Sequence, residues 1–376
     1  ANCQKPKIMK IDLIAGARPN FMKIAPIIDA IKVAQSKGKN IEYRLVHTGQ
    51  HYDKNMSGSF FEQLGIPLPN INLEAGGGSQ AEQTAKIMIG YEALLLKETT
   101  DFCLVVGDVT STMACAIVAK KLNTKVIHVE SGIRSWDLSM PEEINRMVTD
   151  SITDYFFTTS ETANQNLIKS GINEENIFFV GNTMIDTLLK HRPNFRKPLI
   201  WEEAGLQERE YIVMTLHRPA NVDEENILKE LMDEIIEHSC GIPIIFPVHP
   251  RTSKIIESLL SANSQQPIAK NLHLAEPLGY LEFNYLVERA KAVITDSGGI
   301  TEETTVMDIP CMTLRDNTER PETIELGTNE LLGVNPKAIA PAMTTLFSGN
   351  WKSGSIPHLW DGKTAERIVD HLLLLS

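Results

Sequence analysis

Acidic residues stand at three places in the first half of the chain where they could carry proton-transfer chemistry. Asp108 and Glu130 each come just after a short apolar run, and Glu142 and Glu143 follow Pro141. Like-charge crowding among Asp108, Glu130 and Glu142 would push their pKa values apart, so that one group could take a proton while another gave one. The alternative for Glu142 and Glu143 is that they are ordinary first-turn acids of a helix starting at Pro141, where the helix dipole favours them.

A glycine-containing segment in the second half is suited to a phosphate and a sugar. Residues 295–303 read TDSGGITEE, between a short apolar run and a helix-compatible segment. Gly298 and Gly299 have no Cβ, so a ligand could approach their backbone, and the amides of a helix N-terminus favour an anion. Glu302 and Glu303 could accept hydrogen bonds from sugar hydroxyls. Together these features indicate a nucleotide site; the alternative is an ordinary strand-to-helix turn whose glycines serve only the bend.

Basic residues complete the set of side chains that could do chemistry. Arg18 lies in the loop 16–20, where it could bind a phosphate with two hydrogen bonds or be only a surface charge. This loop is not the dinucleotide fingerprint GxGxxG, so it does not support a nicotinamide cofactor. In the second half, histidine and arginine side chains stand shortly after apolar runs. They are His217, Arg218, His249, Arg315 and Arg320. We therefore expect a phosphate side in the second half and an acid–base side in the first.

The elements that must position these residues are short apolar runs alternating with helical patterns. The strands predicted in the first half are 10–15, 42–47, 102–106, 126–129, 155–158 and 177–180, and those in the second half are 211–216, 242–246, 272–274, 293–295 and 310–314. Such alternation predicts parallel sheets, and functional groups gather at the carboxyl ends of their strands. The predicted fold class is α/β, with two doubly wound Rossmann-like domains facing a central cleft.

Length also favours two domains, because a chain of 376 residues is longer than a domain built around one hydrophobic core usually is. The segment 191–198, HRPNFRKP, has two prolines and mixed charge, which is typical of a linker. We expect a first domain over 1–192 and a second over 199–360. A C-terminal helix within 361–376 is expected to pack back on the first domain.

Composition argues against several classes of ligand and partner. The formal net charge is −12, and an acidic surface repels nucleic acid and anionic membranes at long range, so we expect neither as a partner. The five cysteines form no CxxC pair and no zinc-binding spacing with histidine; this pattern predicts no metal site and is typical of a reducing cytoplasm. No apolar run is long enough for a membrane span.

Ten motifs together resemble the UDP-N-acetylglucosamine 2-epimerases, with the non-hydrolysing branch favoured. In chain order they are GARPNFMKIAP (16–26), HTGQH (47–51), GDVTST (107–112), HVESGIR (128–134), PEEINR (141–146), GNTMID (181–186), TLHR (215–218), PVHP (247–250), TDSGGITEE (295–303) and RDNTERPE (315–322). Each motif alone is weak, but the ten cover nearly the whole chain in order. The resemblance implies the glycosyltransferase-B fold and a homodimer.

The resemblance also implies an activity: interconversion of UDP-N-acetylglucosamine and UDP-N-acetylmannosamine for cell-surface polysaccharide precursors. The family's route eliminates UDP to give 2-acetamidoglucal and then adds UDP back, with no cofactor. Four alternatives stay open: a hydrolysing epimerase that releases N-acetylmannosamine and UDP, a 2-epimerase of a related UDP-N-acetylated sugar, a glycosyltransferase of the same fold, and a catalytically silent UDP-sugar sensor.

Matching positions carry over the family's residue roles. The implied catalytic residues are Asp108, Glu130 and Glu142 for proton transfer, and Arg18 and His217 for departure of UDP. The implied substrate-binding residues are Arg18, Lys23, Asn182, Phe283 beside the uracil, Ser297, Gly298 and Gly299 at the diphosphate, Glu303 at the ribose, and Arg320. The sequence does not assign the acid and the base among the three carboxylates.

Two segments depart from the family pattern. His51 is followed by Tyr-Asp-Lys, and Arg218 is followed by Pro-Ala-Asn, where the usual forms differ. These regions help form a second, activating UDP-sugar site in the non-hydrolysing branch. Its candidate residues here are Gln50, His51, Arg218 and His249, and the departures leave its presence open.

Overall fold

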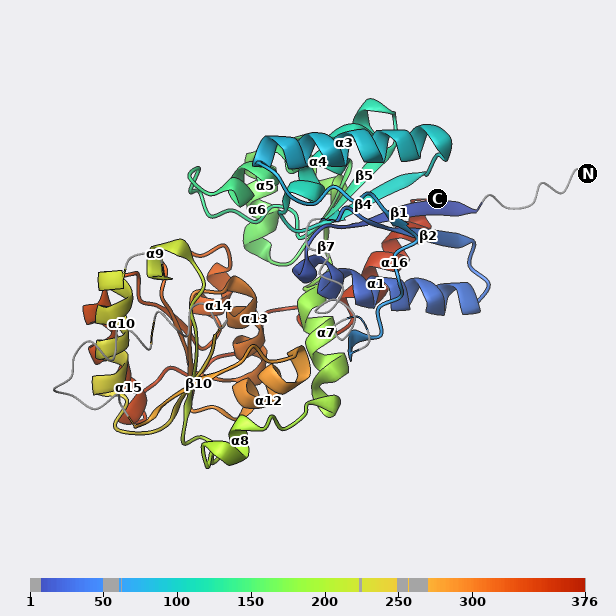
Figure 1. Cartoon of the computed structure of the whole chain (residues 1–376). Helices are drawn as coiled ribbons and strands as arrows, with labels where there is room; N and C mark the ends of the chain where they lie inside the picture. The colour runs from blue at the N-terminus through green and yellow to red at the C-terminus, as the bar shows by residue number, and fades with distance from the viewer. Residues whose placement is uncertain are drawn as a thin grey trace, which may run out of the picture. The chain divides into compact units, whose positions relative to one another are not determined.

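The computed structural model describes residues 8–49, 61, 63–222, 225–248, 256 and 270–375, without the side chains of residues 219, 220 and 225. The chain divides into two compact units (Figure 1). The first unit comprises Ala1–Lys190 and His358–Ser376, and the second comprises His191–Pro357. Each unit has its own parallel sheet and its own hydrophobic core.

The sheet of the first unit has seven parallel strands among the described residues, in the order β3-β2-β1-β4-β5-β6-β7. The strands are β1 (Met9–Ala15), β2 (Ile41–His47), β3 (Ile71–Asn72), β4 (Phe102–Val106), β5 (Lys125–Val129), β6 (Tyr155–Thr158) and β7 (Ile177–Phe179). The helices are α1 (Arg18–Ser36), α3 (Gln80–Lys97), α4 (Thr110–Lys121), α5 (Pro141–Ile152), α6 (Glu161–Lys169), α7 (Thr183–His191) and α16 (Thr364–Leu374). The central strand β4, FCLVV, is buried at every position, as expected of a parallel strand covered by helices on both faces.

The sheet of the second unit has six parallel strands among the described residues, in the order β10-β9-β8-β11-β12-β13. The strands are β8 (Ile212–Thr215), β9 (Ile244–Pro247), β10 (Leu272–Ala275), β11 (Ala292–Thr295), β12 (Cys311–Thr313) and β13 (Asn329–Leu331). The helices are α8 (Ile200–Glu203), α9 (Pro219–Val222), α10 (Glu225–His238), α12 (Tyr280–Arg289), α13 (Gly298–Met307), α14 (Pro321–Glu325) and α15 (Ile339–Phe347).

Each sheet has one point where the strand order reverses. In the first unit β1 pairs with both β2 and β4, and in the second unit β8 pairs with both β9 and β11. In doubly wound sheets, ligands bind outside the carboxyl ends of the strands at such a switch point. The two places to search for a site are therefore the ends of β1 and β4 and the ends of β8 and β11.

The prediction of two parallel α/β sheets is confirmed, and every predicted strand is present within two residues at each end. The edge strands β3 and β13 were not predicted, because two or three residues are too few to show a periodic pattern. Cys103 and Cys115 are buried in the hydrophobic core of the first unit. No helix in the described ranges has the length and apolar character needed to cross a membrane.

Two predicted site residues lie in the first turns of helices, which corrects the loop expected for Arg18 and the turn expected for Gly298. Arg18 is the first residue of α1 and does not lie in a loop. Pro19 suits a first turn, and Asn20 Oδ1 closes the turn by accepting hydrogen bonds from the amides of Gly16 (3.1 Å) and Ala17 (3.0 Å). In the second unit Gly298 likewise belongs to the first turn of α13.

The C-terminal helix α16 packs beside α1 within the first unit, as the red and blue helices of Figure 1 show. Asp186 caps α16 by accepting hydrogen bonds from the amides of Thr364 (3.1 Å) and Ala365 (2.7 Å). Gly181 has a φ of +105°, and a Cβ there would overlap the carbonyl oxygen of Leu359. The first and last residues of the motif GNTMID, Gly181 and Asp186, thus pack against and cap the C-terminal segment of the chain.

Candidate functional site

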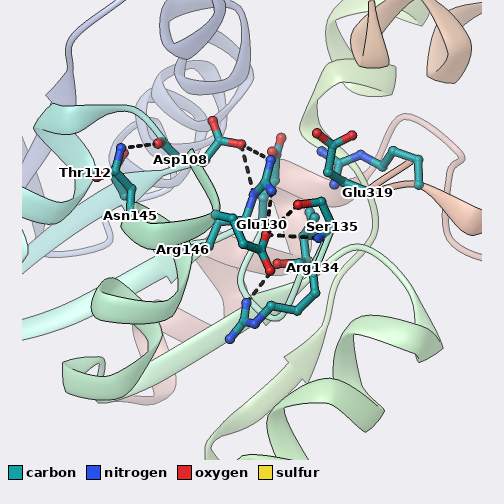
Figure 2. A network of polar contacts seen from close by, with 12 residues as sticks. Asp108, Thr112, Glu130, Arg134, Ser135, Asn145, Arg146 and Glu319 are labelled. Atoms are coloured by element: carbon teal, nitrogen blue, oxygen red, sulfur yellow. Dashed lines mark hydrogen bonds and ion pairs between the residues drawn. The ribbon is translucent and has the colours of Figure 1, made fainter. Parts of the chain in front are cut away.

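Asp108 and Glu130 lie at the carboxyl ends of the neighbouring strands β4 and β5. The amide of Gly107 donates to the carbonyl of Val129 (3.0 Å), so the two strand ends are held together. Arg146 of α5 donates to Asp108 Oδ2 from Nε (3.0 Å) and Nη2 (2.5 Å), and Asn145 Nδ2 donates to the Asp108 carbonyl (2.8 Å), as Figure 2 shows. Helix α5 therefore fixes Asp108 through a charge-assisted pair.

Glu130 is held by Lys23 of α1. Lys23 Nζ lies 2.6 Å from Glu130 Oε2, and the Glu130 side chain is only 2% exposed. Glu130 has a φ of +68°, a left-handed conformation that is uncommon for a residue with a side chain and is frequent at functional sites. Glycine is favoured at position 107 nearby, because its φ is +68° and a Cβ there would lie 3.2 Å from Lys23 Nζ.

The two glutamates that follow Pro141 have different surroundings. Glu142 is exposed, whereas Glu143 is buried and accepts hydrogen bonds from the amides of Ser135 (2.9 Å) and Trp136 (3.1 Å) and from Arg146 Nη1 (2.8 Å). Glu143 thus orients the arginine that holds Asp108. Asp108 and Glu130 each have a basic partner, whose opposite charge acts against the like-charge crowding expected among Asp108, Glu130 and Glu142.

A buried network supports the end of β4 from behind. His128 Nε2 lies 2.8 Å from the Gly107 carbonyl oxygen, and His128 Nδ1 lies 2.7 Å from Asp150 Oδ1. Arg134 Nη1 is 2.6 Å from the other oxygen of Asp150. Burial alone would raise the pKa of Asp150, but His128 and Arg134 outweigh it and hold that pKa below its usual value. The network fixes the backbone from which Asp108 projects.

In the second unit the switch point is built on Asp296, which follows β11. Its carboxylate accepts hydrogen bonds from the amides of His217 (3.0 Å) and Arg218 (2.9 Å) and from Asn221 Nδ2 (3.0 Å), and His217 Nδ1 lies 2.6 Å from Oδ1. Burial acts to raise the pKa of Asp296, but these partners bring it to about 2. Asp296 is fully buried while His217 is 62% exposed, so the carboxylate fixes the ring through Nδ1 and leaves the Nε2 edge toward solvent.

The first turn of α13 adjoins this pair. Ser297 precedes the helix without a side-chain cap, and Ser297, Gly298 and Gly299 are half-buried. Arg218 Nε donates to the Asp296 carbonyl (3.1 Å), which brings a guanidinium to the same strand end. Uncapped amides, a helix dipole and a nearby guanidinium are what a phosphate requires.

Glu303 lies on the next turn of α13, facing α12. The Tyr280 hydroxyl donates to Glu303 Oε1 (2.7 Å). Burial raises the pKa of Glu303 to about 7, and the charge of Glu302 adds to this while Tyr280 opposes it. Phe283 is half-buried on α12, three residues after Tyr280 and therefore on the same face of that helix. An aromatic ring and a carboxylate consequently share this face of the unit.

Two of the remaining predicted residues, Arg320 and Asn182, are more buried than a surface binding role suggests. Arg320 forms a buried ion pair with Glu302, and burial raises the pKa of the adjacent Glu322 to about 7 against the charge of Arg320. Asn182 is fully buried, and its Nδ2 has no hydrogen-bond partner within the described part of the chain. Arg18 is exposed at the start of α1.

Of the candidate activator residues, only Arg218 is described; Gln50, His51 and His249 lie outside the described residues. No group of three or more His, Cys, Asp or Glu side chains that could hold a metal ion occurs within the described ranges.

Sequence reasoning did not identify several residues that build the site: Arg146, Asn145, Asp296, Asn221 and Tyr280. Some signals were present. Arg146 follows Glu143 by one helical turn in PEEINR, and Asp296 directly precedes Ser297 in TDSGG. Neither signal says which distant residue the side chain contacts.

Known proteins share these motifs and this fold. A family model described as UDP-N-acetylglucosamine 2-epimerase matches residues 33–373. The UDP-N-acetylglucosamine 2-epimerase of Methanocaldococcus jannaschii is 41% identical over 369 residues, covering 96% of this chain and 98% of that protein. The UDP-2,3-diacetamido-2,3-dideoxy-D-glucuronate 2-epimerase of Pseudomonas aeruginosa is 36% identical over 372 residues, covering 98% and 100%.

The crystal structure of the M. jannaschii enzyme in complex with UDP-GlcNAc and UDP has a TM-score of 0.83 at 41% identity, covering 97% of this chain and 100% of that one. The α/β fold class expected from the sequence, the glycosyltransferase-B fold, is confirmed by this likeness. The chain therefore belongs to the UDP-N-acetylglucosamine 2-epimerase family.

Proposed function

We propose that this chain interconverts UDP-N-acetylglucosamine and UDP-N-acetylmannosamine by elimination of UDP and re-addition. The observation that carries the proposal is that each sheet has, at the carboxyl ends of its inner strands, groups suited to one part of this chemistry. Asp108 and Glu130 end β4 and β5 with carboxylates held by bases. His217 and the first turn of α13 end β8 and β11 with groups suited to a diphosphate.

Inverting C2 requires a proton to leave a carbon that is not acidic while the sugar is intact. If the bond between C1 and the UDP oxygen breaks first, UDP departs with the electron pair and C2 becomes acidic beside the cationic C1. A carboxylate then takes the C2 proton, and 2-acetamidoglucal forms. UDP adds back to C1 while a proton is delivered to the other face of C2.

The residue roles in this proposal depend on which side chains stand at the carboxyl ends of the strands. Asp108, Glu130 and Glu142 handle the protons, and Arg146 and Lys23 are the ion-pair partners of the first two. Arg18, His217 and the amides of Gly298 and Gly299 stabilise the departing diphosphate. The further substrate contacts proposed are Lys23, Asn182, Phe283, Ser297, Glu303 and Arg320.

The test is proton NMR of the purified protein with UDP-N-acetylglucosamine in D₂O. We expect UDP-N-acetylmannosamine to appear with deuterium at C2. Retention of the C2 proton in the epimer would contradict elimination and re-addition. Free N-acetylmannosamine with UDP would assign the chain to the hydrolysing branch instead.

A second candidate substrate is favoured by the P. aeruginosa relative, which is named a UDP-2,3-diacetamido-2,3-dideoxy-D-glucuronate 2-epimerase. The same NMR experiment with that sugar nucleotide distinguishes the two, because the true substrate exchanges its C2 proton faster at equal concentration. The proposal also includes a homodimer, a cytoplasmic location and a role in supplying polysaccharide precursors. Sedimentation of the purified protein tests the first of these.

A further inference from the structure

A carboxylate lies beside the first turn of α13, where the phosphate chemistry favours positive charge. Arg315, which follows β12, forms a two-armed ion pair with Glu319: Nη1 is 2.8 Å from Oε2, and Nη2 is 2.8 Å from Oε1. Both partners reach Gly298. A Cβ on that glycine would lie 3.7 Å from Arg315 Nη1 and 3.8 Å from Glu319 Oε2. The pair is therefore in van der Waals range of the first helical residue.

A second arginine faces the same carboxylate. Arg218 Nη2 lies 3.9 Å from Glu319 Oε1 and is itself anchored through Nε at the end of β11. Glu319 therefore places a negative charge within ion-pair reach of both arginines. Removing that charge would make the surroundings of the first turn of α13 more positive.

Burial makes this compensation effective. The Arg315 and Glu319 side chains are 4% and 8% exposed, so water screens their charges poorly. The Nε of Arg315 also has no hydrogen-bond partner among the described residues. The adjacent residues Ser297 to Ile300, by contrast, are only half-buried, so an anion can reach them.

We propose that Glu319 is a built-in counter-anion of the α13 phosphate site, which lowers the affinity for UDP below what the basic groups alone would give. It occupies Arg315 and faces Arg218 when no ligand is bound, and it repels the diphosphate when one arrives. The identity of the ligand rests on the proposed function. The benefit would be that UDP, which must leave C1 and return to it in every cycle, is not trapped as the departed anion.

The competing interpretation is that Glu319 merely positions Arg315 for the ligand. The two interpretations predict opposite signs. If Glu319 is a counter-anion, replacing it by neutral glutamine, which has the same shape, tightens anion binding. If it only positions Arg315, the same replacement loosens the arginine and weakens binding.

The experiment is isothermal titration calorimetry of the full chain with UDP and, separately, with inorganic pyrophosphate. We expect Glu319→Gln to bind both probes about tenfold more tightly than wild type, a change of ~1.4 kcal/mol. The control is Glu325→Gln, which removes the same charge from an exposed position on the neighbouring helix α14 and should change either affinity less than twofold. Unchanged or weaker binding by a folded Glu319→Gln variant overturns the proposal.

A second variant and the pyrophosphate probe keep a folding failure, and a failure of the proposed function, distinguishable from a failure of this inference. If Glu319→Gln does not fold, Glu319→Asp is used; it keeps the charge but withdraws it from Gly298, and an affinity equal to wild type overturns the proposal. Pyrophosphate lacks the uridine and the sugar, so its binding reports on the anion site even if the protein fails to epimerise UDP-N-acetylglucosamine. Absence of binding of both probes to wild type and variant overturns the inference as well.

Discussion

The two units end their central strands with opposite arrangements of charge. At the end of β4 the acid is the accessible partner: the Asp108 side chain is 29% exposed, and the Arg146 that holds it is 6% exposed. At the end of β8 the base is the accessible partner, because His217 projects and Asp296 is buried behind it. The comparison teaches that one topology can offer either an acid or a base to a ligand, depending on which member of the ion pair the strand end presents.

The largest effect is expected from the acids of the first unit. Replacing Asp108 by Asn or Glu130 by Gln should lower turnover by roughly 10²–10⁴-fold, the usual contribution of a general acid or base. UDP affinity should change little, because neither carboxylate is among the groups proposed to bind the diphosphate. Turnover comes from the NMR assay and affinity from calorimetry; near-normal turnover would remove these residues from the mechanism.

Glu142 sharpens the same test, since its two interpretations differ in outcome. If it transfers a proton, Glu142→Gln should lose activity like the other two variants. If it is only a first-turn acid, the loss should match that of Glu161→Gln, an exposed first-turn acid of α6. The comparison of the two variants in one assay decides between them.

The next effect concerns the buried acid of the second unit. Asp296→Asn should lower turnover by about 10–100-fold, since a hydrogen bond to a charged group contributes ~1.5–3 kcal/mol. The loss should nearly vanish when Asp296→Asn is made in a His217→Asn background, because the carboxylate would act through the histidine. Additive losses in this double-mutant cycle would contradict a positioning role.

A smaller effect is expected from pH. Because the pKa of Glu303 is raised to about 7, the group is protonated below pH 7 and can then accept fewer hydrogen bonds from ribose. The Kd for UDP-N-acetylglucosamine should therefore rise as pH falls below about 7, by up to about tenfold per pH unit. Glu303→Gln should bind weakly and without this dependence; an equally steep dependence in the variant would assign the titration to another group.

The smallest effect is expected from chelation. The proposed mechanism uses fixed positive groups where other enzymes use a metal ion, so EDTA should leave turnover unchanged. The measurement is the epimerisation rate before and after dialysis against EDTA. A loss restored by magnesium would contradict the proposal, because a metal ion would then supply positive charge that is assigned here to side chains and backbone amides.

Much of this molecule could be predicted from local patterns. Apolar runs predicted the strands, because a parallel strand buried on both faces needs an unbroken apolar segment. The same runs located Asp108, Glu130 and His217, since a polar residue directly after a buried strand lies at the sheet edge. The difference between Glu142 and Glu143 could not be predicted, because both follow Pro141 and only packing of α5 decides which side chain is buried.

The sequence by itself determined the alternation of strands and helices and which side chains stand at the strand ends. Only the tertiary structure decided their partners. His217 and Asp296 are 79 residues apart and meet because β8 pairs with β11, and Lys23 and Glu130 are 107 residues apart. The physical reason is that periodicity and turn chemistry act over a few residues, whereas the charge on a site residue depends on burial and on ion pairs formed across a sheet.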